Sequence, residues 1–460
     1  MKRNLLIAVL SACILLTGQT CSWAASVTNT ASQRNPIPYV PTRHDTVKDL
    51  LWLADVGTND VFYDLGSGDG RIVIAAVRDF GARRAVGIEI SPQLIQESRE
   101  KAAQAGLSNR VQFIQGDLFT NDFSQASVVV LYLGHGANLD LRAQLVRNLK
   151  PGTRVVSHQF GMGEWPADKL LDVRTILFGM YSEFFNEFKT NPDVPDFDNT
   201  GSRASHNVLS AWIVPAPVAG VWRGKVRLES GEGELTLTLH QRLSGVSGSF
   251  QFTGSTNISG SIYTDLWGDH LRFLCIQSYS ALHLVFDGRV KEDTLSGSLW
   301  VTQGQERRAV EWVGHRDRAD FTGTWEWAGP SNTPVQLKIE RRAGQLTATY
   351  TDKNRDLPMY EYATKPIPIT DLYDFGGGFY FTLLLGREGR GGSRRLGPQD
   401  GWLLGEAATH DNTLSGTISF YPYQHRMIGT RPLMGQPTQS DANPALQNGP
   451  RDWQPKRIAP

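Results

Sequence analysis

The fold is decided by the stretch Asp64-Leu65-Gly66-Ser67-Gly68-Asp69-Gly70-Arg71, which ends an apolar, strand-like run and opens a helix-like segment. Glycines lack a Cβ atom, so the backbone can turn sharply there and can approach a ligand closely. Glu89 ends the next strand-like run, at the spacing of about 20 residues that is typical of nucleoside-binding βαβ units. A carboxylate at that point can accept hydrogen bonds from both hydroxyls of a ribose, so the pattern predicts a nucleoside site.

The glycine spacing favours S-adenosylmethionine (SAM) over a dinucleotide. The dinucleotide fingerprint requires glycine or alanine three residues after Gly68, whereas Arg71 stands there and would obstruct the close contact of helix and strand. SAM carries no phosphate, so it needs less of the positive helix end and more room for its methionine arm. We therefore expect SAM to bind, with an NAD site and a ligand-free structural turn as the alternatives. The residues expected to bind the cofactor are Asp64, Gly66, Ser67, Gly68, Gly70 and Glu89.

A further acidic residue, Asp117, ends the third strand-like run. Folds of this kind place a polar group against the adenine at that point, so we include Asp117 among the expected cofactor-binding residues. The alternative is that Asp117 is a helix N-cap or a turn aspartate.

Residues 36–168 alternate strand-like runs with amphipathic, helix-like segments. The second helix has typical start and stop residues, with Ser91 at its N-cap, Pro92 at its first position and Gly106 just past its end. Repeated βα units predict an α/β, Rossmann-like fold with a mainly parallel, doubly wound sheet. The expected strands are residues 61–65, 85–90, 111–115, 128–133 and 154–157, and the expected helices are residues 70–80, 92–105 and 139–149.

From about residue 217 the pattern changes to period-two alternation, which predicts small antiparallel barrels or sandwiches. Gly220-Val221-Trp222 recurs as Gly323-Thr324-Trp325, and the sequence Thr-Leu-Ser-Gly at 294–297 recurs at 413–416, so we interpret this half as two tandem all-β domains. Chance similarity among glycine- and serine-rich turns is the alternative. The predicted domains are residues 26–216 (SAM-binding), 217–316 and 317–429 (β-domains) and 430–460, a Pro-, Asn- and Gln-rich tail expected to be disordered.

The N-terminus has the order of charge, apolar run and small residues that is typical of a secretory signal peptide. Lys2-Arg3 precede an apolar run over residues 5–16, and Ser22-Trp23-Ala24 offers a cleavage site after Ala24. We therefore expect residues 1–25 to be a signal peptide, cleaved between Ala24 and Ala25, and the protein to be exported to the periplasm. The apolar run is too short to span a bilayer comfortably, so no stable transmembrane span is expected after cleavage.

The cysteines leave a second interpretation of the leader open. Leu10-Ser11-Ala12-Cys13 resembles a lipoprotein cleavage box, and an uncleaved membrane anchor is a third alternative. If Cys13 and Cys21 are removed with the leader, only Cys275 remains and no internal disulfide can form.

Composition and motifs limit the partners. Lysine plus arginine (46) balances aspartate plus glutamate (46), so the chain offers no broad attraction for nucleic acid, and none is expected as a partner. The histidines include no His-Glu-x-x-His or paired Cys/His spacing, so no metal site is expected. No Gly-x-Ser-x-Gly elbow places a serine nucleophile.

Residues 36–168 resemble a class I SAM-dependent methyltransferase and, more narrowly, the ATP-synthase c-subunit lysine methyltransferases and their bacterial relatives. In that family the loop upstream of the glycine turn helps to close the cofactor site, so the resemblance implies that Tyr39 and Thr42 contact the cofactor. It also implies protein lysine as an acceptor, and the β-rich half is no part of it. The stretches that carry the resemblance are residues 64–76, Pro38-Tyr39-Val40-Pro41-Thr42, Leu131-Tyr132-Leu133 and Val155-Val156-Ser157-His158-Gln159-Phe160.

Tyr132 and His158 follow the fourth and fifth expected strands, at the edge where open α/β sheets bind their ligands. Methyl transfer from a sulfonium is an in-line displacement, for which a protein supplies mainly alignment and a dry site. An acceptor lysine must be neutral, and burial lowers the pKa of an amine. We expect Tyr132 to position the acceptor or to offer an oxygen lone pair, and His158 to be a polar wall or proton acceptor. The alternatives are a tyrosine satisfied at the sheet edge and a hydrogen-bonded structural histidine.

Three functions fit these patterns: a protein-lysine methyltransferase, a small-molecule N- or O-methyltransferase, and an exported binding protein with a residual SAM site. Fold alone does not choose the acceptor. A residual site should have lost motif residues, whereas Asp64, the three glycines, Glu89 and Asp117 are all present. We therefore expect a cofactor-competent SAM-dependent methyltransferase.

Overall fold

The computed structural model describes residues 37–172, 208–228, 231–254, 257–276, 282–303, 305–317, 320–328, 334–352, 366–385, 401–410, 413–422, 451–453 and 455–459. The expected signal peptide, with both of its alternative cleavage sites, lies outside these residues. The chain separates into a segment that ends at Val40 and one compact unit from Pro41 to Pro460. No helix among the described residues combines the length and the apolar character that a membrane crossing requires.

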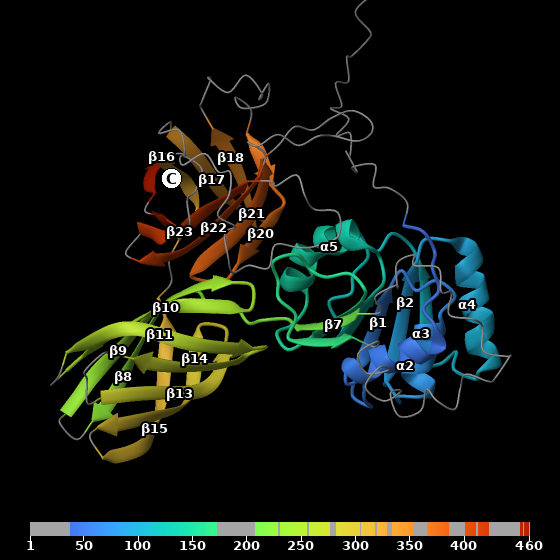
Figure 1. Ribbon diagram of the computed structural model, residues 1–460, viewed down its shortest axis with the longest axis horizontal. Helices are drawn as coiled ribbons and strands as arrows, with labels where there is room; N and C mark the ends of the chain where they lie inside the picture. The colour runs from blue at the N-terminus through green and yellow to red at the C-terminus, as the bar shows by residue number, and fades with distance from the viewer. Residues whose placement is uncertain are drawn as a thin grey trace, which may run out of the picture. The chain divides into compact units, whose positions relative to one another are not determined.

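The compact unit begins with an α/β domain built on a seven-stranded sheet of order β3-β2-β1-β4-β5-β7-β6 (Figure 1). The first five of these strands are parallel, and β7 runs antiparallel between β5 and β6. This arrangement confirms the predicted Rossmann-like fold. Its elements are α2 (His44–Leu53), β1 (Val61–Leu65), α3 (Arg71–Arg78), β2 (Arg84–Glu89), α4 (Pro92–Gln104), β3 (Val111–Gln115), β4 (Val128–Leu131), α5 (His135–Asn148), β5 (Arg154–His158), β6 (Lys169–Asp172) and β7 (Val208–Ile213).

Alternate residues of the central strand β4 pack on opposite faces of the sheet. Val129 and Leu131 belong to the core that contains α5, whereas Val128 and Val130 belong to the core that contains α2 and α3. Complete burial of all four is typical of a parallel strand covered on both sides. The ends of the strands therefore remain as the places where a ligand can approach, at the point between β1 and β4 where the strand order reverses.

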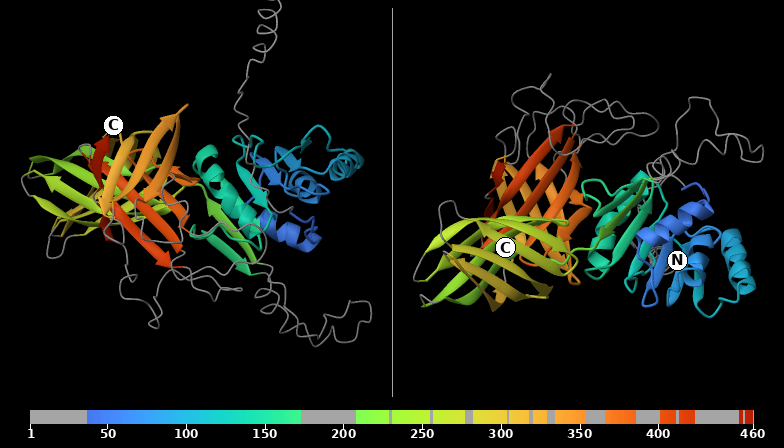
Figure 2. Two further views of the ribbon diagram at one scale, coloured as in Figure 1. Left: turned by 90° about the horizontal axis from the view of Figure 1, so that it is seen from above. Right: turned by 60° about the horizontal axis from the view of Figure 1, so that its bottom comes forward.

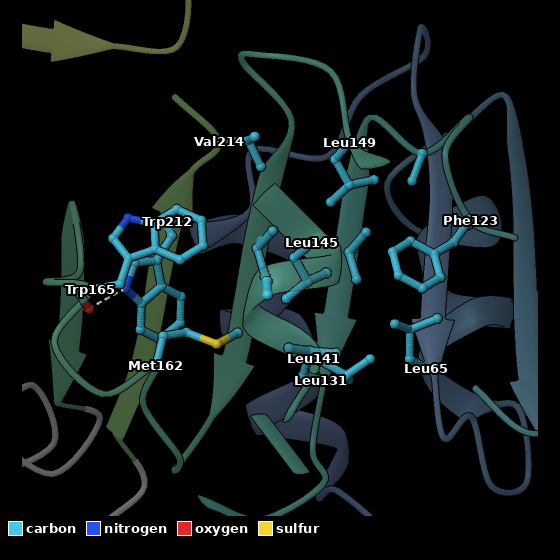
Figure 3. Close-up of a cluster of buried hydrophobic side chains, with 14 of the residues drawn as sticks. Leu65, Phe123, Leu131, Leu141, Leu145, Leu149, Met162, Trp165, Trp212 and Val214 are labelled. Atoms are coloured by element: carbon cyan, nitrogen blue, oxygen red, sulfur yellow. Dashed lines mark hydrogen bonds between the residues drawn. The ribbon is translucent and has the colours of Figure 1, made fainter. Parts of the chain in front are cut away.

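The core on the α5 side anchors this helix to the sheet. Leu141 and Leu145 of α5 lie in one cluster with Leu131 of β4 (Figure 3). Trp165 and Trp212 belong to the same cluster, and the Trp212 indole donates a hydrogen bond to the Trp165 carbonyl (3.0 Å). The helix that follows the end of β4 is thus held by apolar packing, with a buried hydrogen bond beside it.

Two boundaries next to this helix differ from the prediction. β4 ends at Leu131 rather than at residue 133, and α5 begins at His135 rather than at residue 139. Gly134 turns the chain between them with a φ of +99°, a conformation that favours glycine. The first turn of α5 lacks an apolar pattern because its inward-facing residue, Asn138, is polar and fully buried.

The β-rich half opens with a closed, antiparallel barrel of order β10-β11-β12-β13-β14-β15-β8-β9 (Figure 2). Leu235, Leu237 and Leu239 on β9 are fully buried, which confirms the period-two pattern. The strands are β8 (Gly220–Leu228), β9 (Gly231–Arg242), β10 (Gly245–Thr253), β11 (Ile258–Trp267), β12 (His270–Ile276), β13 (Leu282–Lys291), β14 (Thr294–Gln303) and β15 (Glu306–Arg316).

Two five-stranded sheets follow, of order β19-β18-β17-β16-β25 and β20-β21-β22-β23-β24. Side chains from both sheets, such as Trp325 and Phe381, form one core, as in a β-sandwich. These sheets, with the barrel, confirm the all-β prediction for this half. Their strands are β16 (Gly323–Ala328), β17 (Pro334–Arg342), β18 (Gln345–Asp352), β19 (Ile367–Ile369), β20 (Asp371–Asp374), β21 (Gly378–Leu385), β22 (Gly401–His410), β23 (Thr413–Pro422), β24 (Arg451–Trp453) and β25 (Lys456–Ala459).

The expectation of a disordered tail over residues 430–460 is wrong for its last part. Strands β24 and β25 pair with β23 and β16. β24 and β25 are themselves edge strands of the two sheets, and each pairs with a strand from another part of the sequence, so local composition gives no indication of the pairing.

The two Gly-x-Trp motifs share one local geometry, which supports the interpretation as a tandem repeat. Gly220 and Gly323 begin their strands with φ values of +116° and +125°. The indoles of Trp222 and Trp325 each donate to the carbonyl four residues earlier, both at 2.9 Å. The exact domain boundaries stay a prediction.

Candidate active site

The glycine turn joins the end of β1 to α3 and wraps over the end of β2. The backbone N–H groups of Gly66 and Ser67 both donate to the Ile88 carbonyl (2.8 and 3.0 Å). Gly66, Gly68 and Gly70 have φ values of +84°, +52° and +78°, which L side chains rarely adopt.

The space around the turn also excludes any side chain larger than that of glycine at two of these positions. A Cβ atom on Gly66 would lie 2.6 Å from Leu133 Cδ2, and one on Gly70 would lie 2.6 Å from the ring of Phe113. The first of these contacts brings the turn directly against the segment that follows β4, where Tyr132 lies. The expected cofactor and acceptor sides are therefore neighbours.

Glu89 closes the turn from the end of β2. Its Oε2 accepts a hydrogen bond from the Gly68 N–H and its Oε1 accepts one from the Ser91 N–H, both at 2.9 Å. These bonds fix the orientation of the carboxylate beside the glycine turn, as a group that binds a ribose requires.

Asp64 lies at the centre of the turn and is almost fully buried. Burial, followed by the nearby carboxylates of Glu89 and Asp69, raises the pKa of Asp64 to about 8. Its Oδ2 and the Oγ of Ser67 have no hydrogen-bond partner among the described residues. Buried polar atoms without partners are rare in proteins and indicate a place where a ligand or water binds. A cationic hydrogen-bond donor such as the α-ammonium group of SAM fits this pair of atoms.

Asp69 serves the structure of the turn. Burial opposes its charge, but hydrogen bonds from Arg71 and Lys101 outweigh burial and hold the pKa of Asp69 at about 2. Arg71 also donates to the Thr42 carbonyl (2.9 Å), which attaches the upstream loop to the start of α3. The presence of Arg71 spoke against a dinucleotide site in the sequence. In the structure, Arg71 holds the upstream loop that is expected to close over the cofactor.

Three further residues, from the upstream loop and from the end of β3, were expected to contact the cofactor. Thr42 is buried, and its Oγ1 lies 3.5 Å from His158 Nδ1. Tyr39 exposes 48% of its surface. Asp117 follows β3, and its Oδ1 accepts a hydrogen bond from the Phe119 N–H (2.9 Å), as a turn aspartate does. Cofactor contact by Tyr39, Thr42 and Asp117 stays a prediction.

The two expected catalytic residues, Tyr132 and His158, lie side by side. They stand at the ends of adjacent parallel strands, and their ring centroids are 4.1 Å apart. Burial raises the pKa of Tyr132 above an ordinary value that already lies well above neutral, so the hydroxyl is protonated at neutral pH. His158 is buried at the end of β5. The strand ends thus bring together an aromatic ring and an imidazole beside the glycine turn.

Gln159 and Phe160 extend this wall, and sequence reasoning assigned them no role. The Tyr132 hydroxyl donates to Gln159 Oε1 (3.4 Å), and the Phe160 ring stacks on Tyr132 at 6.0 Å. Gln159 has a φ of +71°, an unusual value for a residue other than glycine. Such values cluster at functional sites. Gln159 and Phe160 directly follow a histidine at the end of a strand, and this position is the sequence feature that could have indicated them.

Comparisons with known proteins identify relatives of a part of this chain. A family model described as the ANTKMT methyltransferase domain matches residues 64–169. A protein-lysine N-methyltransferase of Saccharolobus islandicus (strain REY15A) is 41% identical over 137 residues, which are 30% of this chain and 85% of that protein. The ATP synthase c-subunit lysine N-methyltransferase of Xenopus laevis is 34% identical over 134 residues, 29% of this chain and 58% of that protein.

A solved structure of an RNA methyltransferase from Salinibacter ruber, in complex with S-adenosyl-L-homocysteine, is 41% identical and covers 39% of this chain and 96% of its own, with a TM-score of 0.32. All of these similarities concern less than half of this chain, and the match spans little more than half the length of the Xenopus enzyme.

Proposed function

Because this chain belongs to the SAM-dependent methyltransferases that carry the ANTKMT methyltransferase domain, we propose that it transfers a methyl group from SAM to the side-chain amine of a protein lysine. The protein-lysine acceptor is supported by the relatives named for that activity. These matches cover less than a third of this chain, so the activity of the whole chain is part of the proposal.

The observation that carries the proposal is the wall of Tyr132, His158 and Phe160 beside the glycine turn. Aromatic faces bind alkylammonium groups, and they keep water away from an amine as its proton leaves. A lysine side chain is long and apolar up to its amine, so it can enter a channel bounded by such a wall.

When bound, SAM supplies a methyl group that its positive sulfur makes electrophilic. The protein's part is to bring the amine into line and to hold it in its neutral form. The rings of Tyr132 and Phe160 orient the amine, whereas His158 offers a polar atom at the same wall for the departing proton. Glu89 and the glycine turn hold the nucleoside end in place.

Transfer of radioactive methyl from SAM tests the acceptor class. The purified chain is incubated with labelled SAM and, separately, with the protein, RNA and small-solute fractions of a cell extract. We expect label in protein that is recovered as methyl-lysine after acid hydrolysis. Label only in RNA or small solutes would contradict the lysine acceptor, and saturable SAM binding without any transfer would favour the binding-protein alternative.

Cofactor binding is expected to release a proton from Asp64. The free protein keeps this carboxyl protonated at neutral pH because its pKa is about 8. The SAM ammonium group beside it favours the ionised form, so the affinity for SAM should rise with pH by up to about tenfold per unit below about pH 7, and this rise should end at about pH 8, where the free carboxyl and the free SAM amine both lose their protons. Calorimetry in buffers of different ionisation enthalpy measures the proton release.

Asp64→Asn is the reference for this titration. Below about pH 7 the amino group of SAM is protonated both when free and when bound, so proton release measured there comes from Asp64 and is expected to be absent in Asp64→Asn. Equal proton release by wild type and Asp64→Asn would show that Asp64 does not face the cofactor.

A further inference from the structure

Two buried polar residues lie one helical turn apart on α5, on the side that faces the end of β5. Asn138 is 0% exposed and Arg142 is 3% exposed. A buried charge is costly unless hydrogen bonds and opposite charges compensate for it. Their partners therefore show what the helix holds in place.

The wall of Tyr132, His158 and Phe160 is here called the acceptor wall, and two of its residues lie in the segment 157–164. Asn138 binds the beginning of this segment. Its Nδ2 donates to Ser157 Oγ and to the Phe160 carbonyl, both at 3.0 Å. These bonds bracket His158 and Gln159, so they fix the turn in which Gln159 takes its positive φ.

Arg142 holds the end of the same segment. Its Nη1 donates to the Met162 carbonyl (2.9 Å), and its Nη2 pairs with Glu164 Oε1 (2.7 Å). A Cβ atom on Gly163 would lie 2.6 Å from Nη1, so the guanidinium lies directly against this backbone. Asn138 and Arg142 together thus hold residues 157–164.

The remaining donors of Arg142 reach the β-rich half. Its Nε donates to the Tyr373 hydroxyl (2.8 Å), and its Nη2 also pairs with Asp371, both on β20. The hydroxyls of Tyr373 and Thr382 donate to Asp371 in turn. Tyr380 on β21 donates to Glu164 Oε1 (3.4 Å). The Arg142 guanidinium therefore joins the segment behind the acceptor wall to the five-stranded sheet that contains β20 and β21.

We propose that Arg142 is a positioning residue for the acceptor, and that Asp371 and Tyr373 of the β-rich half orient it. The proposal rests on the methyltransferase function, in that residues 157–164 carry His158 and Phe160 of the acceptor wall. It gives the β-rich half a role in catalysis: a sheet remote in sequence sets the position of Gln159 and Phe160. Arg142 and its partners act on the acceptor wall rather than on the glycine turn, so cofactor affinity should be independent of them.

Two mild substitutions test this coupling in the full-length chain. Tyr373→Phe removes one hydroxyl and keeps the buried ring, and Asp371→Asn removes one charge. Asp374→Asn is the matched control, because Asp374 lies on the same strand but pairs with Arg341 (2.7 Å) of the β-rich half. Arg142→Lys keeps the charge and loses the fork of donors.

Hydrogen exchange measures positioning without any acceptor. We expect amides of residues 157–164 to exchange at least about tenfold faster in Tyr373→Phe, Asp371→Asn and Arg142→Lys, and residues 64–70 to exchange as in the wild type. Unchanged exchange in residues 157–164 of folded variants would overturn the proposal whatever the acceptor is. The exchange experiment therefore tests the positioning role of Arg142 independently of the proposed methyltransferase function.

Kinetics with the methyl acceptor distinguishes positioning from a loss of folded protein. We expect the KM for the acceptor to rise about fivefold or more in the three variants, with the Kd for SAM within about twofold of wild type. A purely structural role would instead lower the SAM-binding stoichiometry and kcat together at constant KM. That result, or an equal effect in Asp374→Asn, would contradict the proposal.

Discussion

Replacement of Glu89 by alanine is expected to weaken SAM binding by about 100-fold or more. The carboxylate is the charged acceptor that the end of β2 offers to ribose hydroxyls, and hydrogen bonds to a charged group contribute about 1.5–3 kcal/mol each. Two such bonds amount to about 3 kcal/mol or more, which is the stated change in Kd. Calorimetric titration with SAM measures it.

Part of this loss of SAM affinity comes from a change in the free protein. Glu89 also accepts hydrogen bonds from Gly68 and Ser91, so its removal loosens the glycine turn before any cofactor arrives. Glu89→Gln keeps an acceptor for one of these N–H groups and should lose less affinity than Glu89→Ala.

The control for both variants is Glu100→Ala, because Glu100 is an exposed residue of α4 whose carboxylate accepts a hydrogen bond from Gln96 on the same helix (3.0 Å). We expect its affinity for SAM to equal that of the wild type. Wild-type affinity in folded Glu89→Ala would remove Glu89 from the cofactor site, and with it the nucleoside interpretation of the glycine turn.

The parts of the fold that follow from local chemistry were predictable. The strand Val61–Leu65 is found at its predicted residues, and α4 begins at Pro92 with Ser91 as its N-cap, where the hydroxyl accepts from the Leu94 N–H. A cap, a glycine turn and an apolar run each act over a few residues, so their causes are present in the local sequence.

The parts that depend on distant partners were not predictable. The first turn of α5 was missed because Asn138 is polar, and its burial is explained only by Ser157 and Phe160. In the same way, nothing near Arg142 in the sequence indicates Asp371, more than two hundred residues away. Buried polar networks are satisfied by tertiary contacts, so hydrophobic periodicity underestimates them.

The same limit applies to the candidate site. The glycines and Glu89 form a local motif, and the structure brings them together as expected. Gln159 and Phe160 acquire their meaning from Tyr132, which follows the neighbouring strand. Sequence reasoning could place Tyr132 and His158 at strand ends, but the stacking distance between their rings is a property of the folded sheet.

Replacement of Tyr132 by alanine is expected to lower kcat for methyl transfer by about 100-fold while the Kd for SAM stays within about twofold. The ring packs against both His158 and Phe160, so its loss removes the surface that aligns the acceptor. Displacement of a reacting group by about 1 Å costs roughly this factor. Single-turnover transfer from labelled SAM separates this effect from product release.

Tyr132→Phe distinguishes the ring from its hydroxyl. The hydroxyl's bond to Gln159 is long, at 3.4 Å, and is made at an exposed position, so it contributes little to alignment. We therefore expect Tyr132→Phe to keep kcat within about threefold of wild type, which assigns the positioning to the ring. A loss in Tyr132→Phe as large as in Tyr132→Ala would instead assign the work to the oxygen lone pair. Tyr263→Ala, at an exposed tyrosine of the barrel, controls for the loss of a tyrosine as such and should leave transfer unchanged.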